Sequence, residues 1–392
     1  MRILVTDSDT RAALAAVRTL GARGHEVVTA GISHSSLAAV SRHSTAFERY
    51  PDPAADSEGF VQALAQITRR RNIDVVLPMT EVTTLLVTAH QQKLSGRIPF
   101  PDSTTVANAS DKAFVINLAR ELGIPVPRTL VATSAADGIA RAPELGFPIV
   151  MKPSRSRVRT DEGWVSTGVA YAMDAAALRA ALERLPPAVY PVLLQERIEG
   201  PGVGVFAAVD RGRTVALFAH RRLREKPPSG GVSVLCESAA VDPVAAEHAT
   251  KLLNHIGWRG VAMVEFKQDK RDGSLRLMEI NGRFWGSLQL SILAGVDFPN
   301  IAAAIALEQE LPAPPAYRVG VRSRWLAGDL DAMLLQLFRS RERLNLPPSH
   351  PGRWSALAAF LSPFGPDARC EIERLDDFKP ARLEWARRFK LV

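Results

Sequence analysis

The first hundred residues alternate short apolar runs with helical patterns, and this alternation constrains the fold more than any other feature. An apolar run at residues 2–5 (RILV) precedes the polar turn TDSDT and a helical stripe that closes at Gly24. The run EVVTA follows, and IDVVLPM comes after a second helical pattern. This order predicts a small parallel α/β domain. The first strand-to-helix turn lacks GxGxxG, so we do not expect a dinucleotide site there.

Near residue 105 the pattern changes to α+β with antiparallel hairpins. A helix with Ser110 or Asp111 as its N-cap is predicted to run to Leu122 and to stop at Gly123. Consecutive strand candidates follow, with helices near 174–185 and after Asp242. Helical segments separated by Pro-rich links are expected in the tail. We therefore divide the chain into an α/β domain (1–105), two α+β subdomains (106–190 and 191–310) and a C-terminal extension (311–392).

Charge and cysteine content narrow the classes of function. The chain has 392 residues and a net charge of +8, but its arginines are scattered among acidic residues. We therefore expect an anionic small molecule such as a nucleotide as partner, and not nucleic acid. Cys236 and Cys370 lie far apart, which argues against a disulfide framework or a zinc ribbon and fits a reducing compartment. With no signal-peptide pattern and no run of 18 apolar residues, we expect a cytoplasmic protein without a membrane partner.

The stretch SLRLMEINGRFWGS, at residues 274–287, places three polar residues at two-residue intervals after an apolar run. In a β-strand alternate side chains share a face, so Glu279, Asn281 and Arg283 should point the same way. Glu265 ends the preceding strand candidate, and the short turn between the two predicts an antiparallel hairpin. Three oxygen-bearing side chains would then converge, and Mg²⁺ prefers oxygen ligands. The alternative is that the glutamates are ordinary charges on a solvated strand face.

Two lysines and a loop are candidates for binding phosphate. Lys152 ends a buried strand and Lys112 lies in the first turn of a helix, although either could be an ordinary surface lysine. The loop 154–168 carries three arginines with Gly163 and Gly168, and such a loop can fold over a triphosphate and donate backbone N–H groups. It is not a P-loop, because GxxxxGK[ST] is absent.

The stretch LLQERIEG leads from an apolar strand into a possible hinge. Backbone groups around Glu196 and Ile198 could read an adenine there, with little demand on side-chain identity.

Taken in order, these features resemble the ATP-grasp superfamily. The narrower resemblance is to its carboxylate–amine ligase branch, which is similar to carbamoyl-phosphate synthase. It covers about residues 1–310 and is carried by VTDSDTRAALAAVRTLGARGHEV, the Asp111-Lys112 helix start, EKPPSGGVSV and NGRFWGSLQLSILAGVDFP. It implies a mixed α/β and α+β fold: a Rossmann-like pre-ATP-grasp domain, two subdomains that clamp ATP, and a small, mostly helical C-terminal extension.

The resemblance also implies the nucleotide site. ATP and one or two Mg²⁺ ions, or Mn²⁺, would be the cofactors, and the loop 154–168 would close over the γ-phosphate. Many relatives have an acidic ribose-binding residue where this chain has Gly202, and Glu199 is the expected substitute. The implied ligands are Lys112 and Lys152 for the phosphates and the base edge, Glu196, Arg197 and Ile198 for the adenine, and Glu265, Glu279 and Asn281 for the metal.

The implied reaction is amide formation through an acyl phosphate. Arg283 falls where related ligases place an arginine that meets the acyl phosphate or the carboxylate. Arg222 and Lys226 are assigned to the acceptor side, although the stretch HRRLREKPPSGG could also be a basic strand edge with a disordered loop. The substrates would be a small carboxylic acid and an amine, and a homodimer is a family-level expectation.

The α/β domain offers a second set of polar residues at predicted strand ends. Asp7, Ser8, Asp9 and Arg11 follow one strand, and Glu81 follows another, where open α/β sheets bind ligands. Glu81 could therefore bind a substrate ammonium, while the aspartates and the serine could equally cap the next helix. The histidines lack metal spacing, and we expect structural roles for them.

Two other functions remain open from the sequence. The same site could phosphorylate another acceptor or use bicarbonate, as biotin-dependent relatives do. A nucleotide-binding module without catalysis is the other alternative, although the complete set of Glu265, Glu279, Asn281 and Arg283 counts against it.

Overall fold

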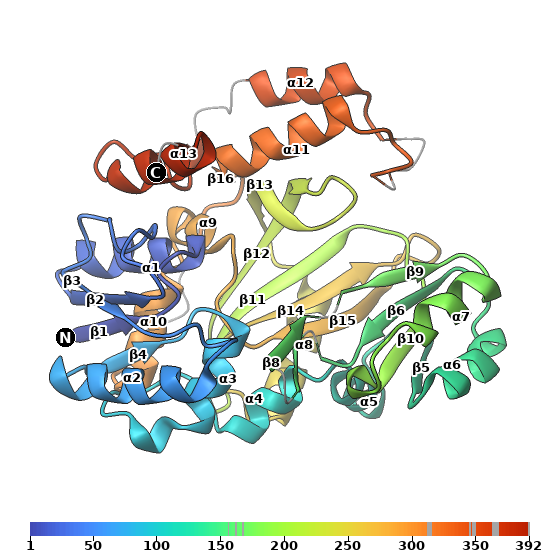
Figure 1. The fold of residues 1–392 in the computed structure, drawn as a ribbon, viewed down its shortest axis with the longest axis horizontal. Helices are drawn as coiled ribbons and strands as arrows, with labels where there is room; N and C mark the ends of the chain where they lie inside the picture. Colours follow the sequence, from blue (N-terminus) through green and yellow to red (C-terminus); the bar gives the residue numbers. More distant parts are fainter. Residues whose placement is uncertain are drawn as a thin grey trace.

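The computed structural model describes residues 1–155, 157–160, 163–166, 168–311, 316–344, 346, 350–362 and 368–390, without the side chains of 157–160 and 163–166. Four bodies of secondary structure follow one another along the chain (Figure 1). They are a parallel sheet with helices, a small antiparallel sheet, a long central sheet and a C-terminal helical segment.

The N-terminal body is the predicted parallel α/β domain. Its sheet has the order β3-β2-β1-β4, all parallel. On β1, Ile3 and Val5 belong to one buried cluster and Leu4 to another, so both faces of the sheet are covered, as in other parallel sheets. The strands are β1 (Arg2–Val5), β2 (Glu26–Gly31), β3 (Ala46–Arg49) and β4 (Val75–Leu77), and the helices are α1 (Arg11–Ala22), α2 (Ser57–Arg70), α3 (Glu81–Ala89) and α4 (Ser103–Ala109).

The small antiparallel sheet has the order β5-β10-β6-β9, with β10 between strands that precede it in the chain. Helix α5 begins at Lys112 with Asp111 as its N-cap, and Leu122 caps its end before Gly123, as predicted. The elements are α5 (Lys112–Glu121), β5 (Thr129–Ala132), α6 (Ala135–Arg141), β6 (Ile149–Pro153), the hairpin β7 (Arg157–Thr160) and β8 (Gly163–Ser166), β9 (Ala170–Ala172), α7 (Ala175–Glu183) and β10 (Val192–Glu196). Single 3₁₀ turns lie at Gln91–Lys93, Ala142–Glu144 and Pro187–Val189.

The central sheet runs β15-β14-β11-β12-β13-β16-β17. Arg211 and Gly212, both with positive φ, make a two-residue turn between β11 and β12, which suits the twist of a hairpin. Helix α8 starts at Pro243 after the N-cap Asp242. The elements are β11 (Gly202–Asp210), β12 (Arg213–Lys226), β13 (Val232–Ala239), α8 (Pro243–His255), β14 (Gly260–Gln268), β15 (Leu275–Asn281), α9 (Leu288–Ala294) and α10 (Phe298–Ala306).

The C-terminal segment is mostly helical, as expected, but it also extends the central sheet. It contributes β16 (Arg322–Arg324) and β17 (Ala368–Cys370), which pair with β13 and with each other. Strands of three residues (RSR and ARC) carry too little periodicity to be recognised from sequence. The helices are α11 (Leu326–Phe338), α12 (Arg353–Leu361) and α13 (Lys379–Arg388), and α13 is drawn above the N-terminal domain in the view of Figure 1.

A buried arginine of the first helix joins the two ends of the chain. The guanidinium of Arg18 donates to Asp377 Oδ2 at 2.8 Å and to the backbone oxygens of Glu371, Ile372 and Asp377. The side chains of Arg18 and Asp377 are 2% and 1% exposed. The C-terminal segment is therefore fixed to the N-terminal domain through an ion pair removed from water.

Among the described residues, no single helix is long and apolar enough to cross a membrane. The bent pair α9 and α10 passes the test only when the two helices are taken together, by length and composition.

We predict that Arg18→Ala lowers the free energy of unfolding by roughly 3 kcal/mol or more, because it leaves the Asp377 carboxylate buried without its cation. Urea unfolding followed by circular dichroism measures the loss. The control is Arg2→Ala, which breaks the exposed Arg2–Glu26 pair and should leave the unfolding midpoint almost unchanged. Equal shifts in the two variants would show that Arg18 does not hold the ends together.

Candidate active site

The site is built on the antiparallel pair β14 and β15, where Glu265 lies directly opposite Glu279. Asn281 Nδ2 donates to Glu279 Oε1 at 3.1 Å, and Arg283 Nη2 donates to Asn281 Oδ1 at 3.2 Å. The predicted hairpin is confirmed, and Glu279 and Asn281 share one face of β15. Arg283 was expected on the same strand face, but it lies in a bend beyond the end of β15 and joins the other two through the Asn281 side chain.

The two candidate lysines are brought together by a contact between α5 and the end of β6. Lys112 N donates to Ser154 O at 2.7 Å, and Ser154 Oγ donates to Asp111, the N-cap of α5. This contact holds the first turn of α5 beside the strand that carries Lys152. The ammonium of Lys112 lies 3.2 Å from Glu279 Oε2, and the Lys152 ammonium lies 3.8 Å from Met278 Sδ.

Burial and mutual attraction set the charges of this cluster. Burial lowers the pKa of Lys152, against the opposing effect of Glu279. Burial likewise raises the pKa of Glu265, although Arg222 opposes it. For Glu279 burial alone would raise the pKa, but Lys112, Asn281 and Lys152 together lower it. Glu279 is therefore held as a carboxylate, ready to act as a ligand for a cation.

The donor set suits a magnesium ion that also binds phosphate. No group of three His, Cys, Asp or Glu side chains in the described part of the chain is placed to hold a metal on its own. Glu265, Glu279 and Asn281 instead offer two carboxylates and an amide oxygen, and Mg²⁺ usually takes one or two carboxylates and completes its shell with phosphate oxygens and water. The residues present therefore fit the ion.

The structure separates the two residues assigned to the acceptor side. Arg222 lies 3.1 Å from Glu265 and 3.2 Å from Glu225, so it belongs to the carboxylate cluster. Lys226, four residues further along β12, lies instead 2.6 Å from Asp331 of α11. The two side chains therefore have different surroundings, and only Arg222 contacts a candidate metal ligand.

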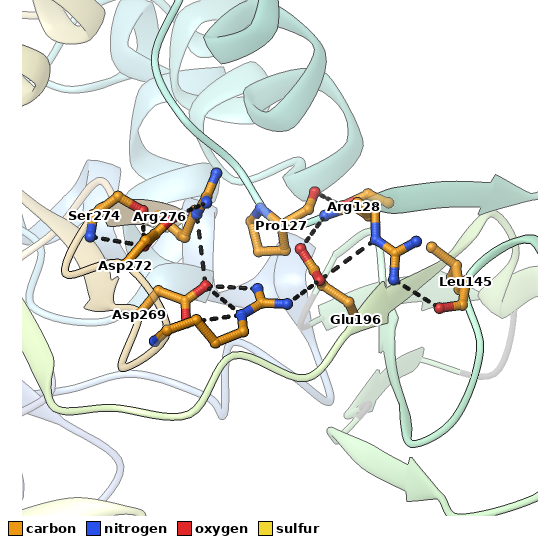
Figure 2. A network of polar contacts seen from close by, with 10 residues as sticks. Pro127, Arg128, Leu145, Glu196, Asp269, Asp272, Ser274 and Arg276 are labelled. Atoms are coloured by element: carbon orange, nitrogen blue, oxygen red, sulfur yellow. Dashed lines mark hydrogen bonds and ion pairs between the residues drawn. The ribbon is translucent and has the colours of Figure 1, made fainter.

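The predicted hinge begins at Glu196, the last residue of β10. The carboxylate of this residue already has hydrogen-bond and ion-pair partners. Glu196 accepts from Arg128 N at 2.9 Å and pairs with the guanidinium of Arg271 at 3.1 Å; Asp269, at 2.6 Å, holds the same guanidinium (Figure 2). The Glu196 carboxylate therefore connects β5 with the β14–β15 turn. A base bound at this hinge would be read by backbone groups, as the sequence suggested.

The rest of the hinge contacts a residue of β14 that the sequence analysis missed. Ile198 is buried, and its carbonyl oxygen accepts from Lys267 Nζ at 3.3 Å. Burial lowers the pKa of Lys267, and Arg197 lowers it further. Lys267 stands two residues after Glu265 on β14, so strand alternation alone could have placed it near the site. Glu199 is exposed.

The glycine-bearing loop is described only in part. Gly163 begins β8, and Gly168 stands before β9, where an added Cβ would meet nothing within 4 Å. Residues 156, 161, 162 and 167 lie outside the described residues. The role of this loop over the γ-phosphate therefore stays a prediction.

A small pocket joins this cluster to the N-terminal domain. Its free volume is about 20 Å³, close to that of one water molecule. Glu81 and Thr84 of α3 contribute to its lining together with Arg283. The full lining is Glu81, Thr84, Val106, Ser110, Lys112, Glu279, Ile280, Asn281, Gly282 and Arg283.

The aspartates after β1 have separate tasks. Asp7, with a positive φ of 54°, accepts from Met79 N and Thr83 Oγ1, so it ties the end of β1 to the start of α3. The N-cap of α1 is Thr10 and none of the three candidates. Asp9 pairs instead with Arg387 of α13 at 2.8 Å.

Comparison with known proteins decides the family. Residues 188–328 match the model of an ATP-grasp family described as "ATP-grasp in the biosynthetic pathway with Ter operon". A D-alanine–D-alanine ligase of Ectopseudomonas mendocina is 31% identical in an alignment of 224 positions that covers 53% of this chain and 68% of that enzyme. The chain belongs to the ATP-grasp family. It is an ATP-grasp ligase, of the type that joins a carboxylate to an amine with ATP.

Solved structures agree on the fold. An L-amino acid ligase from Bacillus licheniformis superimposes with a TM-score of 0.62 at 17% identity, covering 79% of this chain and 75% of that one. A biotin carboxylase–β,γ-ATP complex from Campylobacter jejuni gives a TM-score of 0.66 at 16% identity, covering 82% and 74%. At such identities the likeness concerns the fold alone.

One histidine of the ATP-grasp ligase is buried beside this region. His220 Nε2 lies 2.8 Å from Ser287 Oγ, and the ring stacks on Phe206 at 4.7 Å. Burial lowers the pKa of His220 to about 3. The ring is therefore neutral at pH 7 and too weak a base to take up a proton there, which agrees with the structural role expected from the sequence.

We predict that His220 makes the enzyme less stable as the pH falls from about 6.5 towards 3. The unfolded chain binds a proton at His220 below about pH 6.5 and the folded chain does not, so acid favours unfolding by about 1.4 kcal/mol per pH unit. The free energy of unfolding is measured in urea at pH 7.5 and at pH 5. Its decrease between the two should be about 2 kcal/mol smaller for His220→Gln than for the wild type. If the free energies of unfolding of the wild type and of His220→Gln depended on pH in the same way, the assignment of a neutral His220 ring would be contradicted.

Proposed function

We propose that this ATP-grasp ligase activates a small carboxylic acid as an acyl phosphate and transfers the acyl group to an amine, with ADP and phosphate as the other products. The observation that carries the proposal is the pocket shared by Lys112, Glu279, Asn281 and Arg283 with Glu81. It combines groups for phosphate, metal and carboxylate with an anion suited to a substrate ammonium.

The nucleotide would lie between the β5-β10-β6-β9 sheet and the β14–β15 hairpin. Lys112 and Lys152 come from the first of these bodies and its adjoining helix, and Lys267 from the second, so the phosphates would be held from both sides. The adenine would meet the backbone of Arg197 and Ile198. Glu199 remains the candidate for the ribose.

Magnesium would be held by Glu265, Glu279 and Asn281. When bound, it neutralises the β- and γ-phosphates and aligns the phosphorus that is attacked. Lys112 and Arg222 now balance the two carboxylates, at 3.2 Å and 3.1 Å. They would remain as the cations nearest to the metal site.

In the first step a substrate carboxylate oxygen attacks the γ-phosphorus, and the bond from phosphorus to the bridging oxygen of ADP breaks. Arg283 would stabilise the charge on the transferred group, and the donation of its guanidinium to Asn281 Oδ1 and to Phe284 O, beside the candidate metal ligands, supports this role. In the second step the amine nitrogen attacks the carbonyl carbon, phosphate leaves, and the nitrogen loses a proton. Exclusion of water protects the acyl phosphate between the steps.

Glu81 points to an amino acid as one of the substrates. It is the first residue of α3 and lines the same pocket as Arg283. A carboxylate and a guanidinium in one pocket suit a molecule that carries both an ammonium and a carboxylate. A homodimer and a cytoplasmic location remain parts of this proposal.

We predict that Glu279→Gln lowers the rate of phosphate release at least about 100-fold, because the metal loses a charged ligand. The assay follows phosphate and ADP from Mg-ATP with pooled carboxylic acids and amines. Asp272→Asn, an exposed carboxylate on the β14–β15 turn, serves as the control and should keep full activity.

The wild-type result also separates the alternatives. Release that requires both an acid pool and an amine pool supports the ligase. Release with bicarbonate or an alcohol and without an amine would contradict amide formation. ATP binding without turnover in any pool would favour a non-catalytic module.

We further predict that Glu81→Gln raises KM for the amino-acid substrate about tenfold and changes kcat little, because it removes a charged contact made equally in the ground and transition states. The control Glu121→Gln changes an exposed residue at the end of α5. Steady-state kinetics with the free and the N-acetylated substrate provide the test. If the acetylated substrate were equally sensitive to Glu81→Gln, the ammonium would not be the group recognised.

A further inference from the structure

A second and larger cleft lies where the N-terminal domain meets the C-terminal segment. Its volume is about 470 Å³, within the range of small-molecule sites. We call it the junction cleft. Its lining is Asp9, Arg11, Leu37, Trp325, Ala327, Asp331, Glu384, Arg387 and Arg388, none of which lines the pocket beside Glu279.

The junction cleft opens at the edge of the sheet where ligands of open α/β folds bind. Asp9 follows β1 and Leu37 follows β2, so the cleft begins at the carboxyl ends of two neighbouring parallel strands. The opposite wall comes from α11 and α13. The polar turn TDSDT singled out in the sequence therefore contributes Asp9 to a cleft that the ligase reaction does not use.

Opposite charges lie side by side at its mouth. Arg387 Nη1 lies 2.8 Å from Asp9 Oδ1 and 3.0 Å from Oδ2, and the other Nη donates to Ser35 O. The Arg387 and Asp9 side chains are 36% and 58% exposed. Arg387 Nε has no partner among the described residues, and the Asp9 carboxylate has lone pairs to spare. Both groups can therefore take a further partner of opposite charge.

Leu37, Trp325 and Ala327 supply the apolar part of the lining. Leu37 and Ala327 are buried. Trp325 Nε1 donates to Glu384 Oε1 at 2.8 Å, and the Arg11 guanidinium lies 4.2 Å above the Trp325 ring. The Lys226 ammonium also lies 5.2 Å from the centroid of this ring, so the indole is held at its edge and by two cations over the ring. A second ion pair, Asp331 with Arg388, also belongs to the lining.

We propose that the junction cleft binds a small zwitterion of the amino-acid class, with its carboxylate on Arg387 and its ammonium on Asp9. Its side chain lies against Leu37, Ala327 and Trp325. The balance of charge favours a zwitterion over an anion such as a nucleotide, because each arginine of the lining has an acidic partner nearby. The proposal does not rest on the chemistry assigned to Glu279.

The test is binding of equimolar L-amino acid pools to the full chain without ATP, by saturation-transfer NMR followed by calorimetry with the acids that respond. The Glu279→Gln variant should bind as the wild type does, which separates this site from the catalytic one. Arg387→Ala and Asp9→Asn should each weaken binding about tenfold, the effect of one charge-assisted contact. Arg382→Ala, an exposed arginine of the same helix, is the matched control.

Modified ligands identify the groups that are recognised. The wild type should bind the carboxamide of the acid about tenfold more weakly than the acid itself. Arg387→Ala should bind the acid and its carboxamide equally, because the contact that the carboxamide lacks is already absent from this variant. The N-acetyl derivative should behave in the same way towards Asp9→Asn. Urea unfolding midpoints show whether each variant is folded. Absence of binding to the wild type, or affinity independent of Arg387 and Asp9, would overturn the proposal.

The same ligand could be the amine substrate or an effector, and turnover separates the two. Mass spectrometry of the product shows incorporation if the ligand is a substrate. A change in ADP release without incorporation shows an effector.

Discussion

The opposition of Glu265 and Glu279 on two paired strands is the constraint on which the site depends. Two carboxylates this close and partly buried repel each other unless cations compensate them. Arg222 comes from β12 of the same central sheet, but Lys112 arrives from α5, so a second body of the fold must meet the hairpin for the charges to balance. The charges of the site therefore balance only when these parts of the fold are assembled.

Much of this arrangement could be predicted from local pattern. Period-two spacing predicted the shared face of Glu279 and Asn281, and capping chemistry predicted the starts of α5 and α8. The domain type followed from the alternation of strands and helices. These features depend on interactions between residues a few positions apart, so both partners of each interaction are visible in one short stretch of sequence.

The remaining features depend on contacts between distant segments. Nothing in the sequence around Lys226 indicates that its partner is Asp331, and the attachment of Arg18 to Asp377 spans almost the whole chain. The strands β16 and β17 exist because the edge of β13 offers them hydrogen bonds, not because three residues prefer an extended form. Strand alternation could have placed Lys267 on the same face as Glu265, but only the structure shows that its ammonium donates to the Ile198 carbonyl.

The continuous sheet from β15 to β17 and the buried Arg18–Asp377 pair join the N-terminal domain, the central sheet and the C-terminal segment into one frame. The first and last segments of the chain and the central sheet are joined by a ladder and a salt bridge shielded from water. The body of the β5-β10-β6-β9 sheet meets this frame through the segment after β10, the Glu196–Arg271 pair and the packing of α5, with Lys112, against β15. About 20 Å³ is free beside Arg283, so a substrate larger than a water molecule would enter only if this smaller body moved away from the frame.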